Sequence, residues 1–178
     1  MKIEEKISWK TEWAIYKWGK APQELAAFLQ NGGSIKEAVE VFKVQPSIEV
    51  FEGNIALNEG LQELIDIICG LGTPTKWDNT NARIGVGDSD VAASATQTGL
   101  QGTNKTFKGM DTGYPQRSNQ TAEWRATFGS AEGNHAWKEH TVVNAADDAG
   151  KNLNRKVEDK GTKQSGETWT ESLKITFS

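Results

Sequence analysis

The sequence predicts a mainly β protein, folded as an antiparallel β-sandwich or jelly roll. Several segments alternate apolar and polar residues with a period of two, which is typical of strands that bury one face. Turn-forming residues recur between these segments, and the chain contains 18 glycines. Seven tryptophans supply the large aromatic side chains that strands favour. Short strands at close intervals, with one flanking helix, indicate two packed sheets.

The first and last alternating segments are the clearest predicted strands. On the apolar face of the first lie Ile7, Trp9, Trp13 and Ile15, with Thr11 among them. On the apolar face of the last lie Trp169, Leu173, Ile175 and Phe177, with Glu171 as the single charge. Residues 121–128, 135–143 and 153–158 alternate in the same way, so we expect strands there too.

Two regions are predicted to be helical. Residues 21–42 form a short helical insertion between two strands, divided by Gly32-Gly33, with Ser34 and Glu37 placed for a capping box. Residues 41–44 and 48–51 then read as short extended pieces. Residues 58–70 form an amphipathic helix, which Gly70 ends. Its apolar residues fall at positions i, i+3, i+4 and i+7, namely Leu61, Leu64, Ile65 and Ile68.

Composition argues against several function classes. The chain has 20 basic and 24 acidic residues, and a net charge of −4 provides no electrostatic footprint for nucleic acid. No stretch approaches the roughly 20 apolar residues that cross a bilayer. The first six residues lack the apolar core of a secretion signal. We therefore expect a soluble protein made in a cytoplasm, with neither nucleic acid nor a membrane as partner.

The only cysteine, Cys69, lies in the apolar run Ile67-Ile68-Cys69. We expect it to be a small buried hydrophobe rather than a reactive thiol. A single cysteine also excludes an intrachain disulfide, so the fold must be held by packing.

The residues that could carry chemistry do not form a recognisable site. His135 and His140 lie five apart on a predicted strand, so they point to opposite faces and are expected to be surface polar residues. The run Gly85-Val86-Gly87-Asp88 lacks the third glycine of a dinucleotide loop and the Gly-Lys-Ser/Thr of a phosphate loop. Asp88 and Asp90 leave calcium as an alternative, without the distal glutamate of an EF-hand. We predict no catalytic residue, no cofactor and no metal, and hence no enzyme.

The aromatic residues near the N-terminus are the candidate partner-binding residues. They are Trp9, Trp13, Tyr16 and Trp18. Each large aromatic side chain buries about 150–250 Å² when it is covered. Either the sandwich covers them as part of its own core, or another chain covers them, and the sequence leaves both interpretations open.

A series of short motifs runs through the second two-thirds of the chain. The motifs are Leu57-Asn58-Glu59-Gly60-Leu61, residues 79–88, residues 96–102, residues 108–111, residues 114–118, Phe128-Gly129, residues 136–139, Leu153-Asn154-Arg155-Lys156-Val157 and Gly161-Thr162-Lys163. In order and spacing they resemble a family of structural proteins from the virions of tailed bacteriophages, which are assigned to head decoration or to tail fibres. The resemblance covers roughly residues 54–178.

This resemblance implies a β-sandwich or jelly roll that assembles on a larger particle, often as a homotrimer. It implies no catalytic residues. Because the chain carries neither a repetitive shaft nor a separate receptor-binding head, we expect a capsid decoration or cement protein. Such a protein binds the major capsid protein on the outer surface of the head and reinforces contacts between capsomers.

The alternative is a tail-fibre or baseplate protein that contributes to host recognition. In that case a glycan would bind beside exposed aromatic residues, such as those of Trp77-Asp78-Asn79 or Tyr114.

For either role we expect the chain to be divided into two structural units. Residues 1–53 would form the aromatic strand and helical insertion, packing on or swapping between subunits, and residues 54–178 would form the sandwich domain.

Overall fold

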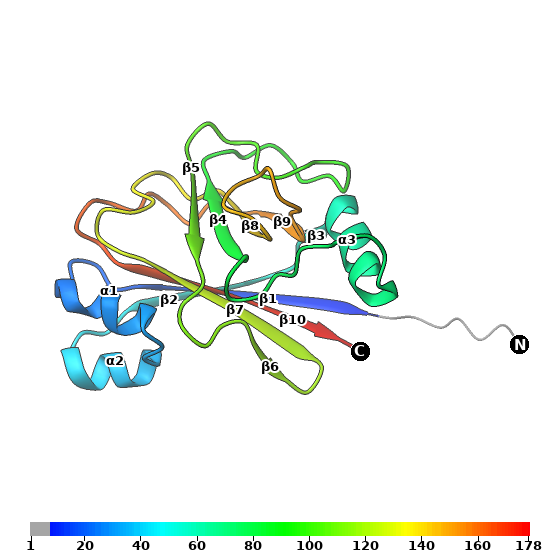
Figure 1. The fold of residues 1–178 in the computed structure, drawn as a ribbon. Coiled ribbons are helices and arrows are strands. Elements are labelled where there is room, and N and C mark those ends of the chain that lie inside the picture. The colour runs from blue at the N-terminus through cyan, green and yellow to red at the C-terminus, as the bar shows by residue number, and fades with distance from the viewer. Residues whose placement is uncertain (1–7) are drawn as a thin grey trace, which may run out of the picture.

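Two antiparallel sheets of five strands each face one another in the structure, a computed structural model that describes residues 8–178 (Figure 1). The first sheet contains β1 (Trp9–Lys17), β2 (Ser47–Glu52), β6 (Gln116–Ser118), β7 (Thr121–Phe128) and β10 (Trp169–Phe177), in the order β2-β1-β10-β7-β6. The second contains β3 (Ile55–Ala56), β4 (Arg83–Gly87), β5 (Lys105–Gly109), β8 (Glu139–Val143) and β9 (Asn154–Val157), in the order β3-β9-β8-β4-β5. This arrangement confirms the prediction of a mainly β sandwich.

The alternation seen in the sequence determines which side chains enter the core. In β1, Trp13 and Ile15 are fully buried, and Trp13 lies opposite Leu173 of β10 and Phe51 of β2. The second sheet contributes inward-facing apolar residues such as Ile84 and Val142, which pack with the first-sheet residues in one core. Ile7, predicted on the same face as Trp13, lies outside the described residues.

Aromatic contacts fill much of the space between the sheets. The rings of Trp137 and Trp169 meet edge to face with their centroids 4.9 Å apart, and Trp137 meets Phe128 in the same way at 4.7 Å. Trp13 stacks on Phe51 with centroids 5.9 Å apart. Such pairs add to the free energy gained from area burial alone.

The predicted helical insertion is present between β1 and β2, as helices α1 (Gln23–Gln30) and α2 (Ile35–Phe42). Ser34 and Glu37 form the predicted capping box at the start of α2. The two helices pack on the outer face of the first sheet, where they form a second apolar cluster of Trp18, Leu25, Leu29 and Ala38. The prediction of extended structure from residue 41 was wrong for Val41 and Phe42. Both continue α2, which Lys43 ends in a left-handed conformation with φ 57°.

The amphipathic helix is also present, as α3 (Asn58–Cys69), and Gly70 ends it with φ 66°. It lies at the end of the sandwich away from α1 and α2 (Figure 1). The expectation that Cys69 is buried was wrong, because its side chain is exposed. Ile67 packs against the core, and each further residue of a helix turns by about 100°, which directs Ile68 and Cys69 to solvent.

Residues 8–53 contribute to the sandwich itself. β1 pairs with β10 along nine residue pairs and with β2 on its other side, so the N-terminal strand lies inside the first sheet. The two units expected from the sequence therefore share one sheet and one core in this chain. Among the helices of residues 8–178, none is long and apolar enough to cross a membrane.

Candidate functional site

The loop of residues 88–104, which joins β4 to β5, covers the outer face of the second sheet. Ile84 and Val86 face the core, so Gly85 and Gly87 face outward beneath this loop. The register places Gly87 opposite Glu139 of β8. A Cβ on Gly87 would collide with the Glu139 carboxylate. The second glycine of the Gly85–Asp88 run therefore leaves room for a buried acid.

That acid forms an ion pair with Arg155 of β9. Arg155 Nε donates to Glu139 Oε2 at 2.8 Å, and Nη2 lies 2.7 Å from the same oxygen. Both side chains are completely buried. A buried ion pair is tolerated when further hydrogen bonds satisfy its remaining polar atoms, and the loop supplies four of them, from two N–H groups, one carbonyl and one side chain.

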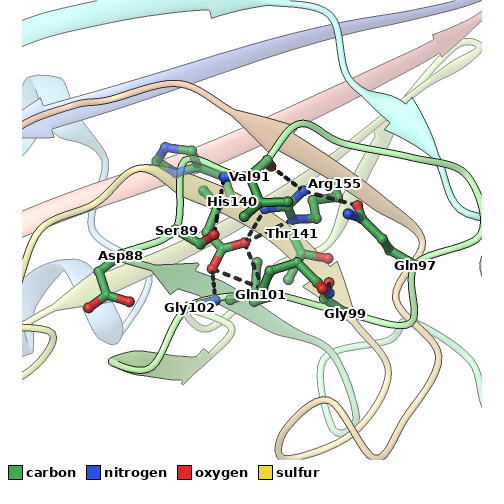
Figure 2. Close-up of polar contacts among 12 residues, drawn as sticks. Asp88, Ser89, Val91, Gln97, Gly99, Gln101, Gly102, His140, Thr141 and Arg155 are labelled. Carbon is green, nitrogen blue, oxygen red and sulfur yellow. Dashed lines mark hydrogen bonds and ion pairs between the residues drawn. The ribbon is translucent and has the colours of Figure 1, made fainter.

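The two ends of the loop bind to opposite partners of this ion pair. Near its C-terminal end, the Gly102 N–H donates to Glu139 Oε1 at 2.6 Å and the Gln101 N–H donates to Oε2 at 2.9 Å. Nearer its N-terminal end, Arg155 Nη1 donates to the Val91 carbonyl at 2.9 Å. The same nitrogen donates to Gln97 Oε1, in the middle of the loop, at 3.0 Å. Figure 2 shows Gln101, Gly102 and Arg155 converging in this way. The Glu139–Arg155 pair thus fixes the path of the loop.

Further contacts fix the base of the loop. Asp88 accepts hydrogen bonds from the backbone and side-chain nitrogens of Asn104, at 3.0 and 2.6 Å. The side-chain hydrogen bond from Asn104 lowers the pKa of Asp88 below its usual value. Asp148 accepts from the Leu100 N–H at 3.1 Å.

The structure gives the calcium alternative no support at this loop. Asp90 lies apart from the contacts of Asp88 and pairs with Lys138 Nζ at 3.6 Å. Residues 8–178 contain no group of three or more His, Cys, Asp or Glu side chains that could hold a metal ion.

Helix α3 reaches the same region. A Cβ on Gly60 would lie 2.5 Å from the Asn152 carbonyl, so only glycine allows the helix this close approach. Glu59 Oε1 accepts from the Asn152 N–H at 2.8 Å, and the Asn58 N–H donates to Ala95 in the loop at 2.8 Å. Motifs far apart in the sequence, from residue 58 to residue 155, therefore meet around one loop.

The loop also presents an outer surface to solvent. Val91 is 54% exposed, and Ser94, Thr96, Thr98 and Gln101 are exposed beside it. The exposed side chains of this surface offer hydroxyl, amide and apolar groups to a partner. The loop backbone that carries them is already held in place by the Glu139–Arg155 pair. A surface of this kind binds a partner without the entropic cost of ordering a flexible loop.

A second buried ion pair attaches the helical insertion to the first sheet. Asp111 Oδ2 accepts from Arg125 Nε at 2.8 Å, and Arg125 Nη2 donates to the carbonyls of Leu29 and Gly33 at 3.0 and 2.9 Å. Burial raises the pKa of Asp111 above its usual value, although the nearby Arg125 charge acts in the opposite direction.

The expectation that both histidines are surface residues was wrong for His140. Its ring is fully buried beside Trp13 and Phe51, and its Nδ1 lies 2.7 Å from Glu171 Oε1. Glu171 is the lone charge on the apolar face of the last strand, so His140 is its partner inside the core. His135 is half-buried, with Nε2 3.0 Å from Thr106 Oγ1.

The four candidate partner-binding residues do not form one surface. Trp9 and Trp13 lie on the inner face of the first sheet, whereas Tyr16 and Trp18 pack with the helical insertion. Trp13 and Trp18 are buried by the chain itself, at 0% and 3% exposure. Trp9 and Tyr16 are half-buried and keep some surface. A partner-binding role for these four residues stays a prediction.

The residues named for glycan binding take part in the protein's own contacts. Trp77 is buried and donates from Nε1 to the Lys151 carbonyl at 3.1 Å. Asp78 Oδ1 accepts the N–H of Asn81 at 3.0 Å. The Arg125 guanidinium lies 4.3 Å from the centre of the Tyr114 ring.

No family model matches the chain, and comparison with curated proteins and with solved structures gives no significant match. Glu139 and Arg155 are not among the site residues predicted from the sequence. A signal was present for Arg155, which shares the apolar face of its predicted strand with Leu153 and Val157. A charge in that position needs a buried partner.

Proposed function

We propose that this protein is a structural component of a tailed-bacteriophage virion that binds the major capsid protein on the outer surface of the head. It would act as a decoration or cement protein by adding buried interface between neighbouring capsomers. Binding that is specific to the assembled state stabilises that state by mass action, so the effect grows with the number of occupied sites.

The observation that carries this proposal is the convergence of the motifs on the loop of residues 88–104. The motifs on which the phage resemblance rests include residues 79–88, 96–102, 136–139 and 153–157. In the structure these four segments supply Gly87, Gln101, Gly102, Glu139 and Arg155, which together build the buried ion pair and its hydrogen bonds. Four of the nine motifs thus supply residues that shape one loop, which is what a protein that works through a fixed surface requires.

We assign the capsid contact to the exposed side of this loop. The buried pair uses its hydrogen-bonding capacity to hold the loop from beneath, which leaves the outward side chains free for a partner. Val91 is the most exposed large apolar residue of the loop, at 54%.

The test is co-sedimentation of the purified protein with capsids that lack it. Wild-type protein is expected to saturate the capsids at a fixed number of copies. Val91→Asp is expected to weaken binding at least tenfold, because it places an unpaired charge in the contact. Val41→Asp is the matched control, since Val41 is a valine of similar exposure, at 60%, on helix α2.

Failure of wild-type protein to bind any assembled capsid would overturn the proposed function. Normal binding by Val91→Asp together with loss of binding by Val41→Asp would instead overturn the assignment of the contact to the loop. Thermal unfolding of each variant shows whether its fold is intact.

A further inference from the structure

The outer face of the first sheet carries a row of polar side chains on three neighbouring strands. The register places Gln116 of β6 directly opposite Glu123 of β7, and Glu123 directly opposite Lys174 of β10. Directly opposite residues point to the same face of a sheet, with their Cβ atoms about 4.5–5.5 Å apart. Trp124 and Leu173, the next residue of β7 and the preceding residue of β10, face the core, so the row faces outward. An amide, a carboxylate and an ammonium group therefore lie side by side.

These three side chains line a hollow in the surface. The hollow has a volume of about 470 Å³, and its remaining walls are Thr121 and the turn between β6 and β7. An adjoining hollow of about 170 Å³ shares Thr121 and Lys174 with it and continues to Lys10 and Glu12 of β1. We call the two hollows together the cross-strand groove. Binding sites for small ligands typically measure about 300–1,000 Å³, so the groove has a suitable size.

The central carboxylate of the groove has unused hydrogen-bonding capacity. Glu123 is half-buried, and no residue of 8–178 donates a hydrogen bond to its side chain. Burial raises the pKa of Glu123 above its usual value, although the nearby Lys174 and Arg125 charges act in the opposite direction. Lys174 itself lies 3.7 Å from Glu12. A half-buried carboxylate without a donor is unfavourable, and a ligand that brings O–H or N–H groups offsets this cost.

An aromatic side chain lies beside the same carboxylate. The Arg125 guanidinium, two residues along β7 from Glu123, lies 4.3 Å from the centre of the Tyr114 ring. Burial raises the pKa of Tyr114 above its usual value, and the Glu123 charge acts in the same direction. Tyr114 is half-buried, so part of its side chain remains exposed. The groove therefore has an aromatic residue next to its polar row.

The composition of the groove indicates the class of ligand. Every side chain that lines it is polar, which disfavours an apolar ligand. Lysines and glutamates are interspersed along it, so a ligand with a large net charge of either sign would meet like charges. A hydroxyl group both donates and accepts hydrogen bonds, and therefore matches a carboxylate, an amide and an ammonium group alike. An uncharged ligand with many hydroxyl groups fits these conditions.

We propose that the cross-strand groove binds an uncharged glycan. Hydroxyl groups of one sugar donate to the Glu123 carboxylate and accept from the Gln116 amide and the Lys174 ammonium group. Tyr114 contacts the apolar face of a sugar ring. The inference is independent of the proposed function, because the groove lies on the first sheet, whereas the loop of residues 88–104 covers the second.

An array of neutral, sialylated and sulfated oligosaccharides tests the ligand class on the full chain. We expect the protein to bind neutral oligosaccharides. The strongest of these is then titrated in solution by calorimetry, where we expect saturation at one oligosaccharide per chain. Binding to none of the oligosaccharides, or to the sialylated and sulfated ones alone, would overturn the proposal.

Two variants test the location of the site. Glu123→Ala and Gln116→Ala should each weaken binding of this oligosaccharide at least tenfold, because each removes hydrogen-bonding groups from the row. The matched controls are Glu40→Ala on α2 and Gln62→Ala on α3, which remove the same kinds of side chain from exposed positions outside the groove. Both controls should bind as the wild type does.

Thermal unfolding of each variant shows whether its fold is intact. Gln116 is exposed on an edge strand, so its variant remains informative even if Glu123→Ala is destabilised. Binding by a folded Gln116→Ala or Glu123→Ala variant that is as strong as that of the wild type would contradict the assigned site. Equal weakening in the two control variants would contradict it as well.

Discussion

Arg155 Nε lies 2.8 Å from Glu139 Oε2, and neither side chain has any exposed surface. Each partner also holds a different part of the loop of residues 88–104. Glu139 accepts from the N–H groups of Gln101 and Gly102, and Arg155 donates to the carbonyl of Val91. A single buried contact therefore ties both ends of the loop to the second sheet.

Replacing one partner should be strongly destabilising. In Arg155→Met the Glu139 carboxylate stays buried without its counter-charge, and breaking a buried pair in this way costs about 3–5 kcal/mol. Denaturant unfolding measures this loss. Hydrogen exchange should also become faster at the amides of residues 91–102, because the Val91 carbonyl loses its hydrogen bond from Arg155 Nη1.

The control for this variant is Lys36→Met, at an exposed helical pair with Glu40 whose charged atoms are 4.0 Å apart. Exposed ion pairs contribute little, so the free energy of unfolding should hardly change. Equal losses in the two variants would contradict the central role of the buried pair.

Gly87 and Gly109 provide a matched test of the space beneath the loop. In Gly87→Ala the new methyl group collides with the Glu139 carboxylate, which the loop amides hold in place. Overpacking of this kind costs about 1–3 kcal/mol. In Gly109→Ala the methyl group meets only Arg83, at 3.7 Å, so the fold should be unaffected. Thermal unfolding of both variants checks the difference, and equal melting temperatures would show that the space is not restricted.

The fold was largely predictable because its signals are local. The period-two alternation of β1 and β10 and the capping box at Ser34 each lie within a few residues of sequence, and the structure confirms them. The error at Cys69 has a different origin, because Cys69 lies in an apolar run and the sequence does not show that the end of α3 is left uncovered. The error at Val41 concerns a helix boundary, since α2 continues through Phe42 before Lys43 ends it.

The buried charges could be predicted only in part. Glu171 and Arg155 each stand on an apolar face, which signals burial, but their partners His140 and Glu139 lie 31 and 16 residues away. Only the folded sheets bring these pairs together. Side chains alternate between the two faces of the first sheet, so Trp13 points into the core between the sheets and Trp18 packs with the helical insertion. A cluster in the sequence thus becomes two separate apolar groups.

Arg125 should control the attachment of the helical insertion. Its Nη2 donates to the carbonyls of Leu29 and Gly33, and its Nε donates to buried Asp111. In Arg125→Met, hydrogen exchange in residues 23–42 should become faster than in the core strands. Arg117→Met is the control, because Arg117 is exposed and donates only to the nearby Asn119 carbonyl. Unchanged protection of α1 and α2 in Arg125→Met would contradict this assignment.

The lowered pKa of Lys163 predicts that the free energy of unfolding rises at alkaline pH. Burial lowers the pKa of Lys163 to about 8 from the usual 10.5, although its Nζ donates to Gly129 and Asn134. Between these two values the unfolded chain binds the proton that the folded chain has lost, so the free energy of unfolding increases with pH.

The Lys163→Met variant lacks this titration and isolates the effect. Relative to this variant, wild-type protein should gain stability as the pH rises from 8 to 10.5, and should show a constant difference below pH 8. Parallel stability profiles across the alkaline range would contradict the lowered pKa. Denaturant unfolding at a series of pH values measures both profiles.

The copy number of this protein per virion tests most directly the proposal that it decorates a phage head. Quantitative mass spectrometry of purified virions gives the ratio of this chain to the major capsid protein. A ratio near one, or a simple fraction that corresponds to hundreds of copies, is the expected result. A few to a few dozen copies would contradict the claim and assign the protein to the tail.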